Sequence, residues 1–281
     1  RRINFFDTAD AYNLGKSEEI IGETLMSYTS RENIVLSTKV GLKMGGDANQ
    51  VGLSRKHLME SIDQQLKRLK TEYIDLYQIH RLDNHTPLEE TLDALTDIKK
   101  AGKIHYIGGS TMPAYKFAQL LTLAECKGYV RPIAMQNLYN LIQRDEERDM
   151  IPLCLENGVG LIPYSPLARG VLAGNRAEGG IGETERAKYD KGLVTGASLI
   201  RNSDKEVIKN VISVANKHNI KPTQVALSWI LNKSGVVSPI VGATKLSHIS
   251  DAVSAIDVEL STDDIKELEK AYQPRAIEPN I

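Results

Sequence analysis

The chain has 281 residues, of which 41% are hydrophobic and 25% charged, and its formal net charge is −1 at pH 7. Such a composition supplies a core for one large domain, and the near balance of charge gives no electrostatic basis for nucleic acid or an anionic membrane as a partner. No apolar run approaches the roughly 20 residues of a membrane span, and only two cysteines favour a reduced, cytoplasmic setting over a disulfide scaffold.

Short β-branched segments alternate with longer segments of helical periodicity along the whole chain. We predict strands, in chain order, over residues 3–9, 34–40, 74–80, 105–111, 132–137, 160–166 and 236–242. The helical periodicity between them is clearest in two apolar stripes, Leu58, Ile62, Leu66 and Leu69, and Leu88, Leu92, Leu95 and Ile98. This alternation predicts parallel strands that are joined by crossover helices.

The number of predicted strands favours one particular arrangement of them. A doubly wound nucleotide-binding sheet would carry G-x-G-x-x-G after its first strand, and this sequence has none. Seven strands without an internal linker instead predict a single α/β domain over residues 1–281, a (β/α)₈ TIM barrel. Because the chain begins at Arg1 in mid-strand, we expect that the first β/α unit is absent from it. The long irregular stretch 167–203 is typical of a lid or binding loop.

Polar residues of complementary chemistry follow the first three predicted strands. Asp7 and Tyr12 follow the first strand, Lys39 the second and His80 the third. In a barrel these strand ends meet at the catalytic face. An ammonium stabilises the phenolate form of a tyrosine, and a carboxylate keeps that ammonium charged. The pattern therefore predicts Asp7, Lys39 and Tyr12 as a proton-donating relay, with His80 orienting a carbonyl oxygen. An acid without a nucleophile calls for an external hydride.

Ordered motifs run along nearly the whole chain: Asn4-Phe5-Phe6-Asp7-Thr8-Ala9 with Tyr12, Ser37-Thr38-Lys39-Val40, Leu76-Tyr77-Gln78-Ile79-His80, Ile107-Gly108-Gly109-Ser110, Gln136-Asn137, Tyr164-Ser165-Pro166-Leu167 and Ile240-Val241-Gly242-Ala243-Thr244. Together they resemble the motifs of the aldo-keto reductases. The runs YNLIQRDEERDMIPLC (139–154) and SPLARGVL (165–172) are most similar to the aryl-alcohol-dehydrogenase-like branch. The resemblance implies an NADP(H)-dependent enzyme that reduces small aldehydes or ketones to alcohols by direct hydride transfer.

The same resemblance implies roles for individual residues. Asp7, Tyr12, Lys39 and His80 would form the catalytic tetrad. Ser110 and Gln136 would hold the nicotinamide carboxamide of NADPH or NADP⁺, and Tyr164 would stack on its ring. The remaining cofactor set would be Ser165, Pro166, Leu167 and Gly170 along the pyrophosphate, and Arg186, Gly242, Thr244, Lys245, His248 and Asp251 around the 2′-phosphate and adenine.

The sequence departs from the family pattern at three points and leaves alternatives open. Thr111 stands where asparagine or arginine is common, Ala252 where many members have asparagine, and the first strand and helix have no counterpart. A strand-end lysine also forms Schiff bases in barrels, so Lys39 has a second possible role. Related potassium-channel β subunits bind the cofactor but serve as docking partners; they usually carry asparagine where this chain has His80. The histidines show no metal-ligand spacing, and neither substrate nor oligomeric state is indicated.

Overall fold

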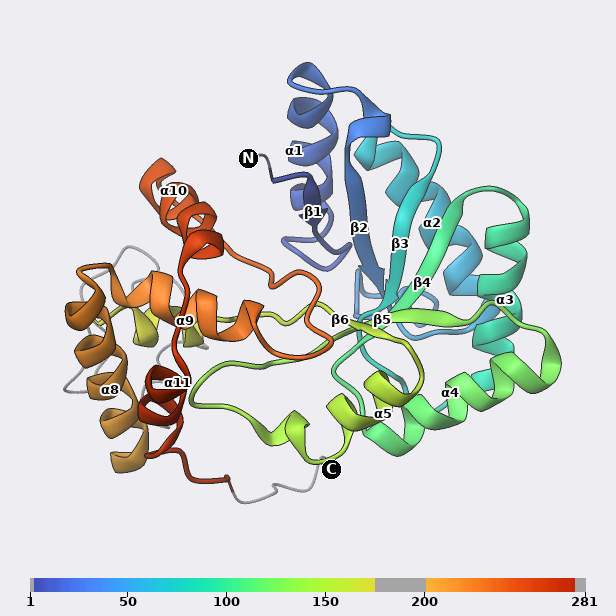
Figure 1. Cartoon of the computed structure of the whole chain (residues 1–281). Helices are drawn as coiled ribbons and strands as arrows, with labels where there is room; N and C mark the ends of the chain where they lie inside the picture. Colours follow the sequence, from blue (N-terminus) through green and yellow to red (C-terminus); the bar gives the residue numbers. More distant parts are fainter. Residues whose placement is uncertain (1–2, 175–200, 276–281) are drawn as a thin grey trace. The chain divides into compact units, whose positions relative to one another are not determined.

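The computed structural model describes residues 3–174 and 201–275 (Figure 1). The longer helices all contain an apolar stripe, and the strands are short. The strands are β1 (Phe5–Asp7), β2 (Val35–Val40), β3 (Ile74–Ile79), β4 (Ile104–Ser110), β5 (Pro132–Gln136) and β6 (Gly160–Leu161). The α-helices are α1 (Lys16–Thr24), α2 (Arg55–Leu69), α3 (Leu88–Lys100), α4 (Ala114–Lys127), α5 (Met150–Glu156), α8 (Asn202–His218), α9 (Pro222–Leu231), α10 (Leu246–Ser254) and α11 (Thr262–Glu269). Short 3₁₀ segments are η1 (Leu25–Ser27), η2 (Arg31–Asn33), η3 (Asp145–Glu147), η4 (Ala168–Ala173) and η5 (Ala255–Asp257).

The six strands form one sheet in the order of the sequence, from β1 to β6. Each neighbouring pair from β1 to β5 is parallel, as strands joined by crossover helices must be. Every strand overlaps a segment predicted from the sequence. The carboxyl ends of these strands therefore lie along one edge of the sheet.

The seventh predicted strand, 236–242, is not formed as a strand. Only Val236 and Ile240 make isolated parallel bridges, to Leu161 and Tyr164 respectively. Pro239 lies between the two bridges, and proline has no N–H to donate to a ladder. The prediction of a continuous strand was wrong because it weighed the β-branched residues and not the proline.

Helix α2 illustrates how the sequence produces the layer that covers the strands. Its buried residues include Leu58, Ile62 and Leu69, three members of the predicted apolar stripe. The Ser54 hydroxyl accepts a hydrogen bond from the His57 backbone N–H and caps the N-terminus. Gly22 of α1 allows a close approach to α2, because a Cβ there would lie 2.3 Å from the Arg68 carbonyl oxygen. The packing of α1 on α2 thus depends on a residue without a side chain.

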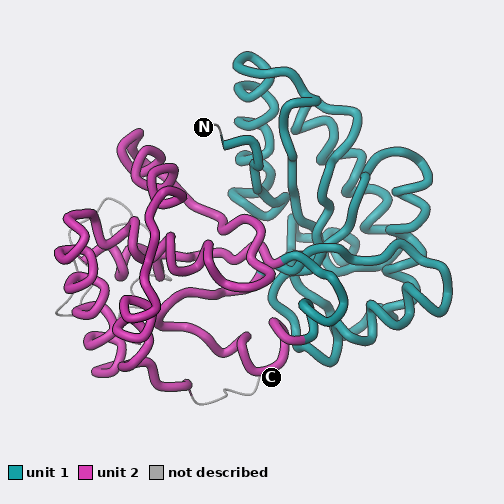
Figure 2. Tube along the Cα trace, viewed as in Figure 1, with its two compact units in different colours: residues 1–136, 153–160 teal, residues 137–152, 161–281 magenta. Residues whose placement is uncertain are grey.

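The chain divides into two compact units (Figure 2). The first comprises residues 1–136 and 153–160, and the second comprises residues 137–152 and 161–281. The second unit has its own core around fully buried Trp229, whose indole N–H donates to Glu269 over 2.8 Å. Within the described ranges, no helix is both long and apolar enough to span a bilayer.

Candidate active site

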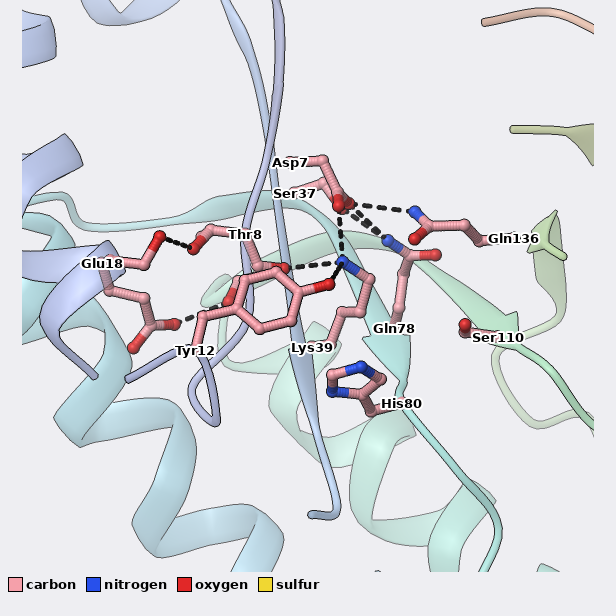
Figure 3. Close-up of polar contacts among 12 residues, drawn as sticks. Asp7, Thr8, Tyr12, Glu18, Ser37, Lys39, Gln78, His80, Ser110 and Gln136 are labelled. Carbon is pink, nitrogen blue, oxygen red and sulfur yellow. Dashed lines mark hydrogen bonds and ion pairs between the residues drawn. The ribbon is translucent and has the colours of Figure 1, made fainter. Parts of the chain in front are cut away.

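The carboxyl ends of β1, β2 and β3 bring the four predicted catalytic side chains together within the first unit (Figure 3). Asp7 ends β1, Lys39 is the penultimate residue of β2, and His80 follows β3 directly. The strand register pairs Asp7 with Ser37, so Lys39 lies two residues further along the same face of the sheet. Tyr12 comes from the loop between β1 and α1.

The Lys39 ammonium is the centre of this arrangement. Its side chain is fully buried, and Nζ lies 2.5 Å from Asp7 Oδ2 and 2.9 Å from the Thr8 carbonyl oxygen. Nζ also lies 3.4 Å from the Tyr12 hydroxyl, to which it donates (Figure 3). A buried ammonium with a carboxylate and a phenol as partners stabilises negative charge on either oxygen.

The Asp7 carboxylate is held by more than the lysine. Oδ1 accepts hydrogen bonds from the Ser37 hydroxyl at 3.1 Å, from Gln78 Nε2 at 3.0 Å and from Gln136 Nε2 at 3.1 Å. Its side chain is only 4% exposed. Hydrogen bonds of this kind fix the orientation of the carboxylate.

His80 also contacts Tyr12 and is electrically neutral at ordinary pH. Burial, with the positive charges of Lys39 and Arg81, lowers the pKa of His80 to about 3. Its ring meets the Tyr12 ring edge-on, with centroids 5.6 Å apart. Nδ1 is buried without a hydrogen-bond partner among the described residues. A neutral imidazole in this position serves as a hydrogen-bond donor or acceptor and not as a cation.

Tyr12 alone among the four presents its side chain to the surroundings, being 42% exposed. Asn13 and Leu14 adopt positive φ angles directly after it, and Gly15 follows at φ 89°. The turn brings the Ser17 backbone N–H back to the Tyr12 carbonyl oxygen. The phenol is therefore accessible to a reactant while its oxygen contacts the buried ammonium.

A second buried network holds the backbone that carries Lys39. Gln65 of α2 donates to the Lys39 carbonyl oxygen at 3.0 Å and to Glu18 at 2.9 Å. Glu18, itself fully buried, also accepts from Thr38 Oγ1 at 2.6 Å and from Arg68 Nε at 2.7 Å. The network ties α1 and α2 to β2 and limits movement of the lysine.

Ser110 and Gln136 lie side by side at the ends of β4 and β5, because the register pairs them directly. Gln136 directs its amide nitrogen to Asp7, which leaves its carbonyl oxygen to accept a further hydrogen bond. Ser110 Oγ accepts from Arg81 Nη1 at 3.3 Å, which leaves its own proton to donate. One donor and one acceptor in this arrangement fit a primary carboxamide, as the nicotinamide ring carries.

Three residues of this site were not predicted from the sequence: Ser37, Gln78 and Arg81. Ser37 and Gln78 each precede a predicted catalytic residue by two positions, and side chains two apart on a strand share a face. That spacing was a usable signal. Arg81 carries no such signal, because its contact with Ser110 depends on the path of the loop after β3.

The remaining predicted cofactor residues belong to the second unit, apart from Arg186, which lies outside the described residues. Tyr164 makes isolated parallel bridges to Leu138 and Ile240. Asp251 pairs with Lys221 at 2.8 Å. The others occupy two places, with Ser165, Pro166, Leu167 and Gly170 in the segment that leads into and forms η4, and Gly242, Thr244, Lys245 and His248 at the N-terminal end of α10, all four of them exposed.

Comparison with known proteins agrees with this chemistry. The model of the aldo/keto reductase family matches residues 1–273. Versiconal hemiacetal acetate reductase of Aspergillus parasiticus is 42% identical, with 99% of this chain and 85% of that protein aligned. A Schizosaccharomyces pombe protein provisionally named an aryl-alcohol dehydrogenase is 41% identical over 99% of this chain and 84% of its own length. Aldo-keto reductase AMT2 of Alternaria alternata is 36% identical, with 97% and 79% covered.

Fold, site and matches together define an oxidoreductase that acts on carbonyl compounds. The chain belongs to the aldo/keto reductase family, and its similarity to aryl-alcohol-dehydrogenase-like members confirms the resemblance seen in the sequence. The six parallel strands agree with the α/β class, and the family implies a (β/α)₈ barrel.

Proposed function

We propose that the protein reduces small aldehydes or ketones with NADPH as hydride donor and Tyr12 as general acid. The observation that carries the proposal is the position of the Lys39 ammonium, which contacts both the Asp7 carboxylate and the Tyr12 hydroxyl. A free tyrosine has a pKa of about 10 and is a weak acid at neutral pH. A cation next to the oxygen stabilises the phenolate that remains after proton transfer.

The chain's own residues each have a part in the proposed reaction. When bound, the reduced nicotinamide supplies a hydride to the carbonyl carbon. Tyr12 donates its hydroxyl proton to the carbonyl oxygen, and Lys39 stabilises the resulting phenolate. Neutral His80 hydrogen-bonds the same oxygen and orients it. Ser110 and Gln136 would hold the nicotinamide carboxamide and so orient the ring.

We also propose a preference for NADP(H) over NAD(H). Lys245 and His248 are exposed at the N-terminal end of α10, where the family resemblance puts the 2′-phosphate. A helix N-terminus attracts anions, and two cationic or ionisable side chains add to that attraction. Arg186 completes the proposed set.

The substrate class is proposed from the names of the relatives and from the exposed phenol. One relative is named as a hemiacetal acetate reductase and another as an aryl-alcohol dehydrogenase. Tyr12 is open to a reactant, and aromatic or short aliphatic aldehydes are small enough to approach it. A panel of both kinds, followed by NADPH oxidation, identifies the preferred chemistry.

The experiment that tests the mechanism is the substitution Tyr12→Phe, with Tyr28→Phe as the matched control. Tyr28 is 86% exposed and lies outside the site. Loss of a general acid typically costs 10²–10⁴-fold in rate, so Tyr12→Phe should lower kcat by about that factor and leave NADPH affinity unchanged. Tyr28→Phe should leave both unchanged. Near-normal kcat in Tyr12→Phe would show that another group supplies the proton.

The sequence left two other functions open, and each has its own test. A Schiff base requires a lysine amine that is free to attack a carbonyl carbon, whereas Lys39 Nζ is fully buried and donates to Asp7 Oδ2 and to the Thr8 carbonyl oxygen. Borohydride in the presence of an aldehyde should therefore fail to attach the substrate covalently. A non-catalytic docking subunit would bind NADPH without steady turnover of any aldehyde in the panel.

A further inference from the structure

Arg81 joins the ends of two neighbouring strands next to the site. Its Nη1 donates to the His80 carbonyl oxygen at 2.6 Å and to Ser110 Oγ at 3.3 Å. The first contact is at the end of β3, and the second is with the last residue of β4. The guanidinium is half-buried, and the Ser110 side chain that it reaches is buried. Arg81 thus lies between a catalytic histidine and the proposed carboxamide ligand.

Within residues 3–174 and 201–275, no carboxylate pairs with the positive charge of Arg81. Among the residues that the structure describes, Arg81 forms no ion pair. Asp83, two residues further on, accepts instead from the backbone N–H groups of Leu53, His85 and Thr86. These three hydrogen bonds to Asp83 also hold the loop that follows β3 in place.

The charge balance of the site therefore depends on Arg81. Lys39 and Asp7 form a buried pair whose charges cancel. His80 is neutral at ordinary pH. Among these described residues, Arg81 contributes the one unpaired positive charge beside Ser110.

We propose that Arg81 is a positioning residue whose uncompensated charge favours the reduced over the oxidised nicotinamide cofactor at this site. The inference rests on the proposed function, because it requires that the nicotinamide end is held at Ser110. The oxidised ring carries a positive charge that the reduced ring lacks, and two like charges near a protein interior repel. The contact also engages Ser110 Oγ as an acceptor, so its proton is directed to the carboxamide oxygen.

A pair of substitutions separates charge from shape. Arg81→Gln removes the charge and keeps an N–H donor, whereas Arg81→Lys keeps the charge and loses the planar fork. The dissociation constants of NADPH and NADP⁺ are measured by calorimetry on the full chain, with thermal melting as a control for folding. We expect the ratio Kd(NADP⁺)/Kd(NADPH) to fall by roughly three- to tenfold in Arg81→Gln. In Arg81→Lys it should change by less than about twofold, since the charge is retained.

An unchanged ratio of the two dissociation constants in Arg81→Gln would overturn the inference while leaving the proposed function intact. If the ratio stays unchanged because both cofactor forms bind more weakly by the same factor in both variants, Arg81 acts only through the position of Ser110. If the wild-type protein binds neither form, the proposed function itself is wrong, and the inference fails with it.

A second measurement needs no variant and applies even if Arg81→Gln does not fold. Salt screens a half-buried charge, whereas the phosphate contacts are common to both cofactor forms and cancel in the ratio. The wild-type ratio should therefore fall as ionic strength rises. A ratio independent of salt would contradict a role for the Arg81 charge.

Discussion

Substitution in the buried pair of Lys39 and Asp7 should lower both the stability of the protein and its turnover of aldehydes. Lys39→Met keeps most of the side-chain volume and removes the ammonium. The substitution would leave the Asp7 carboxylate, 4% exposed, without its 2.5 Å partner at Oδ2. It would also remove the cation that lies 3.4 Å from the Tyr12 hydroxyl.

The expected loss of stability follows from what remains around Asp7. Removing one partner of a buried ion pair costs about 3–5 kcal/mol, because the other charge stays buried. Ser37, Gln78 and Gln136 still donate to Oδ1, so we expect the lower end, about 3 kcal/mol. For a chain of this size that corresponds to a melting temperature lower by about 6–10 °C.

The assay is urea unfolding of the wild type, Lys39→Met, Asp7→Asn and the double variant, with aldehyde turnover measured in parallel. If the two groups stabilise each other, the loss of unfolding free energy in the double variant should be smaller, by about 2 kcal/mol, than the sum of the losses in the two single variants. Turnover should fall by about 10²-fold or more in Lys39→Met, since Tyr12 loses the charge that stabilises its phenolate. Additive losses, or a Lys39→Met cost below about 1 kcal/mol, would refute the reasoning.

Three further predictions concern residues outside the predicted catalytic set. Burial, with the nearby Glu18 carboxylate, raises the pKa of Asp10 from 3.8 to about 7. Between about pH 4 and 7 the folded protein therefore retains a proton on Asp10 that the unfolded chain has lost. Because of this difference, the free energy of unfolding falls as pH rises through that range. Asp10→Asn should remove this loss of stability at high pH. The melting temperature of the variant minus that of the wild type should therefore be more positive at about pH 8 than at about pH 5. An equal difference at the two pH values would contradict the raised pKa of Asp10. Gly22→Ala should cost about 1–3 kcal/mol in urea unfolding, because its Cβ would meet the α2 backbone at 2.3 Å, whereas the control Gly46→Ala meets nothing within 4 Å and should be neutral. Lys245→Ala should weaken NADPH binding by about fivefold and leave NADH unaffected in calorimetric titrations; equal weakening of the two would remove the basis for the 2′-phosphate assignment.

The sequence by itself located the strands of the sheet and indicated which polar side chains would meet at their ends. Periodicity and β-branched runs located all six strands of the sheet, because parallel strands that are buried on both faces must be apolar. Asp7, Lys39 and His80 were predicted to meet because polar residues at the ends of adjacent parallel strands share one edge. In the structure Lys39 contacts both Asp7 and Tyr12, and the ring of His80 contacts that of Tyr12, which agrees with that prediction. The family pattern added the cofactor residues, whose roles stay predictions.

Only the tertiary structure decided which groups form hydrogen bonds with the side chains of the site. Gln78 and Gln136 reach Asp7 from 71 and 129 residues away in sequence, and Arg81 reaches Ser110 by the path of a loop. Hydrogen bonds depend on distances of a few tenths of an ångström and on side-chain direction, and neither composition nor periodicity specifies these. The failed strand at 236–242 has a different origin, because Pro239 is visible in the sequence and removes a backbone donor locally. The sequence therefore specified the elements and the reactive side chains, whereas the electrostatic environment of those side chains was set by contacts between distant segments.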